Sequence, residues 1–108
     1  FKMAVYSIEV EDFEELIGLM EDKTSPNFSL KLSQNIVNTI IENLNTKKRF
    51  LNVLEVYIRE TDDVLDITVD RDDFVETLKT NLITQEHFEE YEMCTKIQEA
   101  LDYLENKK

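Results

Sequence analysis

Glycine and proline each occur only once in this chain of 108 residues, as Gly18 and Pro26. Folds made mainly of β-strands use both residues at their many tight turns, so this scarcity favours helices. Hydrophobic residues make up 42% of the sequence, which is enough for one packed core and too much for a disordered chain. We therefore expect residues 1–108 to form a single domain of all-α class, a compact bundle of about five helices.

Hydrophobic spacing predicts where these helices lie. In most of the candidate segments, apolar residues recur every three or four positions and charged residues stand between them. The predicted helices cover residues 10–23, 28–49 and 49–60, the stretch that follows an N-cap at Asp70, and residues 85–108, which follow an N-cap at Thr84.

The third of these segments, "RFLNVLEVYIRE" at residues 49–60, is apolar on nearly every side. That pattern is typical of a central helix with neighbours all round, and we favour this interpretation. The run "VLEVYI" is also rich in β-branched residues, so a strand is the alternative. A minor contact between two strands would fit within the bundle.

The acidic stretch "TDDVLDITVDRDDF", residues 61–74, has oxygen-bearing side chains at the spacing of a calcium loop. Counting from Asp62 as position 1, the ligand positions 5, 7, 9 and 12 hold Asp66, Thr68, Asp70 and Asp73. This stretch resembles an EF-hand, and "TVDRDDFVETL" at residues 68–78, which overlaps its end, carries most of the resemblance. The resemblance implies a helix–loop–helix whose loop pairs through a short strand contact with "FEELIGLMEDKTSPNFSL", where Phe28 corresponds to Val69.

The same segment departs from the EF-hand pattern in three ways. Val64 supplies no oxygen at position 3, Ile67 replaces the glycine of position 6, and Asp73 is one methylene shorter than the usual glutamate. These changes should abolish calcium binding, so we predict neither a metal nor a cofactor. We favour an acidic connector that ends in a helix cap, with a calcium-free EF-hand-like module that clasps a partner helix as the alternative.

Charge is distributed unevenly along the chain. Residues 1–22 have a net charge of −6, residues 23–59 of +4 and residues 60–108 of −10, which together give −12. The acidic ends disfavour nucleic acid and anionic membranes as direct partners and allow a protein partner with a basic surface. The one basic cluster, "TKKRF" at residues 46–50, is expected at a helix end or against an acidic patch of the same chain or of a second copy.

Most carboxylates are expected on helix exteriors, where water keeps them ionised and without a catalytic role. We therefore predict that the protein is not an enzyme. The expected function is that of an acidic helical interaction module, most specifically a small inhibitor or regulator, like phage-type inhibitors or toxin-immunity proteins, that docks on a basic surface of a partner protein. The candidate partner-binding residues are Glu11, Glu14, Glu15, Glu89, Glu90 and Glu92. A partial DNA mimic is a further alternative, because the acids of the last helix approach part of the charge density of duplex DNA.

Histidine and cysteine also occur once each. His87 and Cys94 lie two helical turns apart, which does not make a nucleophile–base pair, and with Glu90 they form only a weak metal set. We expect Cys94 to be a small buried hydrophobe in a cytoplasmic or other reducing intracellular compartment, since a single cysteine forms no internal disulfide. Apolar runs fall short of the roughly 18 residues that cross a membrane. Met3 is expected to be the natural first residue, which makes Phe1 and Lys2 an addition.

Overall fold

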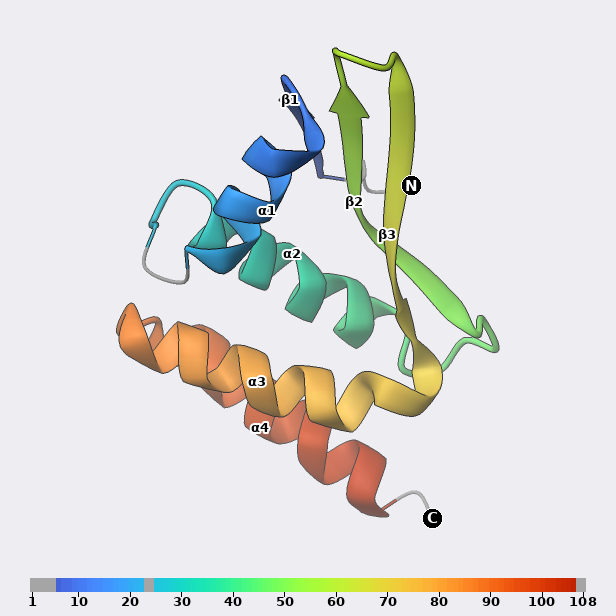
Figure 1. Ribbon diagram of the computed structural model, residues 1–108. Coiled ribbons are helices and arrows are strands. Elements are labelled where there is room, and N and C mark those ends of the chain that lie inside the picture. The colour runs from blue at the N-terminus through green and yellow to red at the C-terminus, as the bar shows by residue number, and fades with distance from the viewer. Residues whose placement is uncertain (1–5, 23–24, 107–108) are drawn as a thin grey trace.

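A three-stranded β-sheet is the centre of the fold, so the all-α prediction is wrong. The computed structural model describes residues 6–22 and 25–106, and the expected start at Met3 lies outside these ranges. Along the described chain the elements are β1 (Ser7–Val10), α1 (Phe13–Glu21), α2 (Ser29–Glu42), β2 (Phe50–Ile58), β3 (Asp63–Asp70), the 3-10 turn η1 (Arg71–Asp73), α3 (Phe74–His87) and α4 (Tyr91–Asn106). The described part is therefore a mixed α/β fold with four α-helices (Figure 1).

The central strand of the sheet is β2. β1 pairs with it in parallel, so that Ser7 lies beside Glu55 and Val10 beside Ile58, and β3 pairs with it antiparallel on the other side. Side chains alternate between the two faces of a sheet. The apolar face carries Ile8, Val10, Leu51, Val53, Leu54, Val56, Ile58, Leu65, Ile67 and Val69. The strand residues of the opposite, polar face are all exposed or half-buried.

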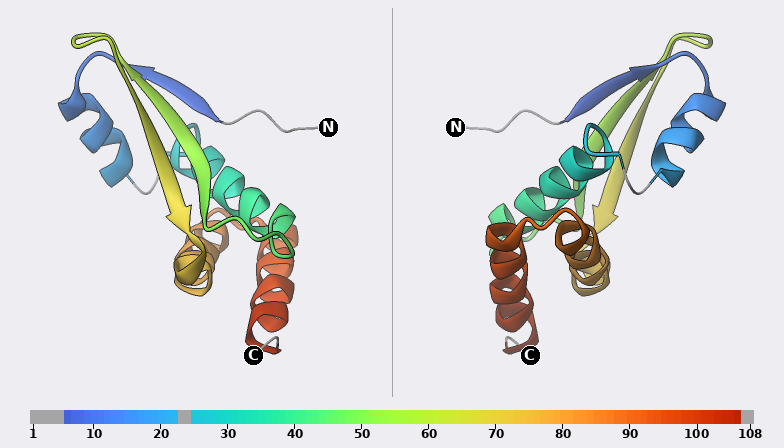
Figure 2. Two further views of the ribbon diagram at one scale, coloured as in Figure 1. Left: turned by 90° about the vertical axis from the view of Figure 1, so that its right-hand side faces the viewer. Right: turned by 90° about the vertical axis from the view of Figure 1, so that its left-hand side faces the viewer.

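Two hydrophobic clusters form the core, and both take their strand residues from the apolar face. One joins α1 and the start of α2 to the sheet through Leu16, Phe28, Leu54 and Val56. The other joins α2, α3 and α4 to the far ends of β2 and β3. Its buried members are Val37, Ile40, Leu51, Phe74, Leu78, Ile97, Ala100 and Leu101. Figures 1 and 2 show α3 and α4 side by side at the end of the sheet that lies away from the β2–β3 turn.

The predicted helix over residues 49–60 is a strand, and a β-bulge explains the error. The register between β2 and β3 shifts between Asn52 and Leu54, so that Val53 and Leu54 are both buried although they are adjacent. The polar face of β2 also carries Phe50 and Tyr57. Together these features conceal the alternation of a strand and make the sequence look apolar all round.

The EF-hand resemblance is also wrong for this fold. The segment before Asp62 is a strand instead of a helix, and residues 63–70 form β3, which accounts for the apolar thread in this acidic stretch. Within residues 6–22 and 25–106, no three His, Cys, Asp or Glu side chains are arranged to hold a metal ion. The predicted cap is confirmed, because Asp70 Oδ1 accepts a hydrogen bond of 3.0 Å from the Asp72 N–H at the start of η1.

The last predicted helix is interrupted by a turn. Thr84 lies inside α3 instead of capping α4, and the chain turns at Glu89, whose φ of 58° lies in the left-handed region. The helices predicted over residues 10–23 and 28–49 correspond to α1 and to α2, which ends earlier, at Glu42. None of the described helices is both long and apolar enough to cross a membrane.

Candidate interaction surface

Parallel pairing of β1 with β2 brings two acidic segments together that are far apart in the sequence. Residues 7–22 and 55–66, which we call the acidic half, contain twelve acidic side chains and one basic side chain, a net charge of −11. The remaining described residues contain twelve acidic and seven basic side chains. The negative charge of this protein is therefore concentrated around β1, α1 and the β2–β3 turn.

The single base of the acidic half, Arg59, is already engaged. Its Nε donates to Glu11 Oε2 at 2.9 Å and its Nη1 donates to Glu9, and both hydrogen bonds raise the pKa of Arg59. Its backbone N–H also bonds to the Val10 carbonyl at 3.0 Å. Arg59 thus ties β2 to β1, and most acids of this region keep their charge uncompensated.

The β2–β3 turn at the tip of this region is held by a tyrosine. The Tyr57 hydroxyl donates to Asp62 Oδ1 at 2.5 Å, and this hydrogen bond is the main reason why the pKa of Tyr57 is raised. Asp62 has a φ of 56°, in the left-handed region that such turns require. The contact therefore orients the Asp62 carboxylate at the tip.

Two of the predicted partner-binding residues have a structural role at the start of α1. The Asp12 side chain accepts from the Glu15 N–H at 2.9 Å, and Glu15 Oε1 accepts from the Glu11 N–H at 2.7 Å. Asp12 is therefore the N-cap of α1, and the Glu15 side chain ties the residue before this cap to the first turn. Glu14 is exposed on the same turn and makes no side-chain hydrogen bond or ion pair within the described part of the chain.

The other three predicted residues lie elsewhere in the molecule. Glu89, Glu90 and Glu92 belong to the α3–α4 turn and the start of α4. Figure 1 shows both helices away from the β2–β3 turn. Glu90 is half-buried and accepts from Gln34 Nε2 at 3.1 Å, which fastens the turn to α2. The six candidates therefore do not form one surface.

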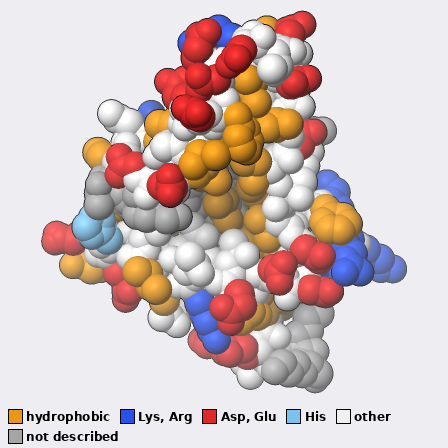
Figure 3. All heavy atoms as spheres, viewed as in Figure 1, with side chains coloured by type: hydrophobic (Ala, Val, Ile, Leu, Met, Phe, Trp, Pro, Cys, Tyr) orange, Lys and Arg blue, Asp and Glu red, His pale blue; other side chains and the backbone are white. Residues whose placement is uncertain are grey.

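Hydrophobic side chains are exposed among the acids of the acidic half and beside it. On α1, Phe13 is 55% and Ile17 is 43% exposed; on the apolar face of β3, Leu65 is 36% exposed and Ile67 is half-buried. We call these four residues, which lie on α1 and on the sheet face against which α1 packs, the apolar strip. Figure 3 shows hydrophobic side chains gathered over the sheet and the flank of α1, with acidic side chains around them toward the tip. The sequence did not predict this strip, because Leu65 and Ile67 join a common face only through the pairing of β3 with β2.

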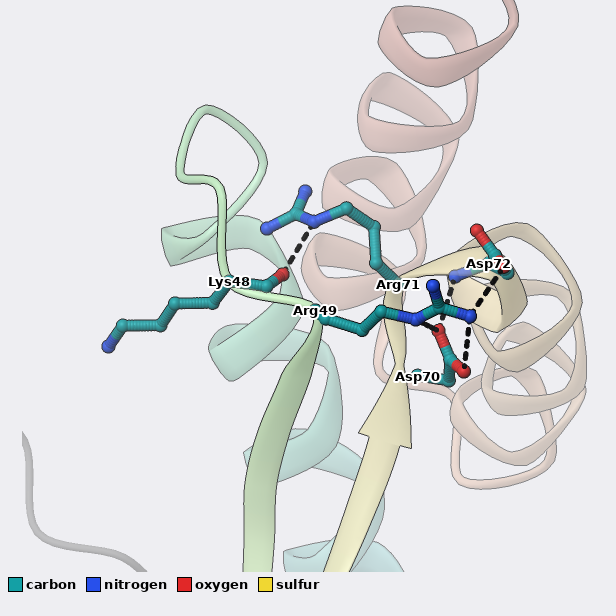
Figure 4. A network of polar contacts seen from close by, with 5 residues as sticks. All are labelled: Lys48, Arg49, Asp70, Arg71 and Asp72. Carbon is teal, nitrogen blue, oxygen red and sulfur yellow. Dashed lines mark hydrogen bonds and ion pairs between the residues drawn. The ribbon is translucent and has the colours of Figure 1, made fainter.

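The basic cluster at residues 46–50 contacts an acidic patch of the same chain, which was one of the positions predicted for it. Arg49 Nε lies 3.3 Å from Asp70 Oδ1, and its Nη2 lies 3.1 Å from Asp72 Oδ2 (Figure 4). In addition, Arg71 Nε donates a hydrogen bond of 2.6 Å to the Lys48 carbonyl. The cluster does not stand at the end of a helix, since α2 ends at Glu42.

His87 and Cys94 form no reactive pair in the structure. Cys94 is half-buried, and burial together with nearby Glu86 and Glu90 raises the pKa of its thiol, which disfavours the nucleophilic thiolate. The His87 ring instead makes an edge contact with Phe88, with ring centroids 4.9 Å apart.

Comparison with known proteins gives no family for this chain: no family model, no curated protein and no solved structure matches it.

Proposed function

We propose that this protein is a non-enzymatic interaction module that docks through its acidic half on a basic surface of a partner protein, as a small inhibitor or regulator. The observation that carries the proposal is the convergence of residues 7–22 and 55–66, which gathers a net charge of −11 beside the exposed apolar strip. Charge complementarity speeds and orients association, and burial of apolar side chains supplies affinity. A surface with both properties suits a partner that is basic at its rim and apolar at its centre.

The geometry narrows the set of contact residues. Glu11 and Glu15 are occupied by Arg59 and by the cap of α1, so we propose the unengaged acids of the acidic half as the charged contacts, among them Glu14, Glu60 and Asp63. These three side chains are exposed, and no side-chain hydrogen bond or ion pair ties them to another described residue.

The test compares two variants of equal charge. E14Q/E60Q/D63N neutralises three acids of the acidic half, and E89Q/E92Q/E99Q neutralises three exposed acids around α4. Each immobilised protein is exposed to an extract of its native source at low and at high salt, and the captured proteins are quantified by mass spectrometry. We expect the same basic partner on the wild-type protein and on the α4 variant, less of it on the acidic-half variant, and a decrease with salt.

Equal capture of the partner by the wild-type protein and the acidic-half variant would contradict the proposal. Loss of capture by the α4 variant alone would move the interface to the α3–α4 turn. If duplex DNA displaces the captured partner, the alternative of a partial DNA mimic gains support. A clasp of the EF-hand type requires a helix–loop–helix, and residues 50–58 and 63–70 are strands instead. We also propose a reducing compartment for the protein, from its single cysteine.

A further inference from the structure

The outer edge of β3 is open. The sheet order is β1-β2-β3, so within the described part of the chain no strand pairs with the side of β3 that faces away from β2. β3 spans eight residues, "DVLDITVD", with neither proline nor lysine, and the bulge of this hairpin lies in β2. Natural sheets usually protect such an edge with lysine, proline, a bulge or an inward-pointing charge, because its free N–H and C=O groups can pair with another strand. Asp63, opposite Ile58 at the first position of β3, is such a charge, and the rest of the apolar face of β3 carries Leu65, Ile67 and Val69.

The polar face beside this edge carries a like-charge pair. Glu55 on β2 lies directly opposite Asp66 on β3, and both side chains are exposed. Like charges directly opposite each other destabilise a sheet. The only base of the acidic half, Arg59, is held by Glu9 and Glu11 and does not compensate them. A cation arriving at the edge next to Asp66 would remove this repulsion.

The apolar face beside the same edge is incompletely covered. Residues 63–66 are all exposed, and Leu65 and Ile67 point to the side of the sheet where the core lies. A further strand along β3 would bury Leu65 and Ile67 with its own apolar side chains on that face.

We propose that the edge of β3 binds an extended segment of a basic partner protein, in which lysine or arginine alternates with apolar residues, as a fourth strand of the sheet. The cationic side chains lie on the polar face beside Asp66, and the apolar ones lie on the apolar face beside Leu65. This inference rests on the proposed function and states the mode of docking.

Charge selects this occupant over a second copy of the chain. Pairing of two β3 edges would bring Asp63, Asp66 and Asp70 of both copies together, and each chain has a net charge of −12. An amphipathic helix on the apolar strip would leave the free backbone groups of β3 unpaired. A cationic strand satisfies the backbone groups, the like-charge pair and the uncovered hydrophobic side chains together.

The test uses the full chain and synthetic nine-residue peptides in which lysine and valine alternate. The first control peptide has the same composition with the lysines and valines in separate blocks, and the second is the alternating peptide N-methylated throughout. Binding is followed by fluorescence anisotropy, and backbone amide exchange is followed by NMR. We expect the alternating peptide to bind more tightly than both controls and to protect every second amide of β3, the pattern of a new ladder.

A matched pair of charge reversals tests the position. Asp66→Lys should weaken the alternating peptide about 5-fold or more at low salt, whereas Asp102→Lys, on the exposed side of α4, should leave its affinity unchanged. Asp66→Lys faces Glu55 and is expected to unfold at a higher temperature than the wild-type protein, so that loss of binding cannot be attributed to loss of the fold.

The outcomes separate the two proposals. Equal binding of the alternating and the blocked peptide, or protection confined to α1, overturns the edge proposal and leaves docking through the acidic half standing. Undiminished affinity of Asp66→Lys also overturns it. If, in addition, the E14Q/E60Q/D63N variant captures the basic partner normally, the proposed function fails as well.

Discussion

At the scale of single residues, a polar pair in the helical core is the least expected feature. Gln85 is fully buried and its Nε2 donates to Ser33 Oγ at 2.8 Å, which links α3 to α2. Its Oε1 has no hydrogen-bond partner within the described residues. A buried polar atom without a partner costs free energy, whereas an apolar replacement of the whole pair avoids this cost.

This pair gives the first prediction. Ser33→Ala alone should lower the free energy of unfolding by about 1–3 kcal/mol, because it leaves the whole Gln85 amide without a partner. The double variant S33A/Q85L should recover at least this loss. Urea unfolding of the two variants and the wild-type protein measures both differences. A double variant less stable than S33A would mean that Gln85 has a partner that the structure does not contain.

Asp70 gives a prediction of pH dependence. The Asp72 N–H and the Arg49 guanidinium lower the pKa of its carboxyl below the ordinary value of 3.8. Its folded pKa is below its unfolded one, so its stabilising contribution is complete above pH 3.8 and is lost as the pH falls through the lowered value.

Asp70→Asn keeps the ability to cap η1 and removes the charge. Urea unfolding should find the variant less stable than the wild-type protein at pH 7, and the gap should close as the pH falls below the ordinary value. Asp102→Asn, which changes an exposed aspartate of α4, is the control. A gap that is constant over this pH range would assign the stability of Asp70 to its shape instead of its charge.

At the scale of elements, α1 carries an avoidable cost. Gly18 lies in the interior of this nine-residue helix, and a Cβ added there would meet no atom within 4 Å. Glycine is unfavourable in a helix because its backbone loses more freedom on folding than that of alanine.

Gly18→Ala should therefore raise the free energy of unfolding by about 1 kcal/mol. Thermal and urea unfolding measure the change, and amide exchange within α1 should slow, since alanine stabilises the helix in which these amides are hydrogen-bonded. The control is Thr80→Ala, a substitution by alanine at an exposed position of α3. Ser29→Ala in α2 is not used as the control, because the Ser29 hydroxyl donates to the Asp22 carbonyl and the substitution would remove this hydrogen bond. A destabilised Gly18→Ala variant would contradict the open surroundings of this position.

At the scale of the whole molecule, the charge is segregated. Local repulsion in the acidic half should oppose folding, because only Arg59 lies among its twelve acids. Salt screens such repulsion, and the screening length falls from about 10 Å at 0.1 M to about 3 Å at 1 M.

Added sodium chloride should therefore raise the unfolding temperature of the wild-type protein. The rise should be smaller for E14Q/E60Q/D63N than for E89Q/E92Q/E99Q, although both variants lose three charges. Thermal unfolding at 0.05 M and 0.5 M salt measures the difference. Equal rises in both variants would show that net charge alone, and not its location, controls the salt dependence.

The sequence by itself determined the features that depend on near neighbours. The spacing of Phe13, Leu16 and Met20 predicts α1 correctly, and Asp70 is recognisable as a cap because both depend on residues within one or two turns. The acidic character and the exposed position of Glu14 could be predicted in the same way.

Only the tertiary structure decided the rest. Strand pairing between Ser7 and Glu55 joins residues far apart in the sequence, and no local sequence pattern predicts this pairing. The bulge at Val53 hid the alternation of β2, so β3 and its open edge were hidden as well. The physical reason is that a helix closes its hydrogen bonds within one segment, whereas a strand acquires its partners, its faces and its edges from other parts of the chain.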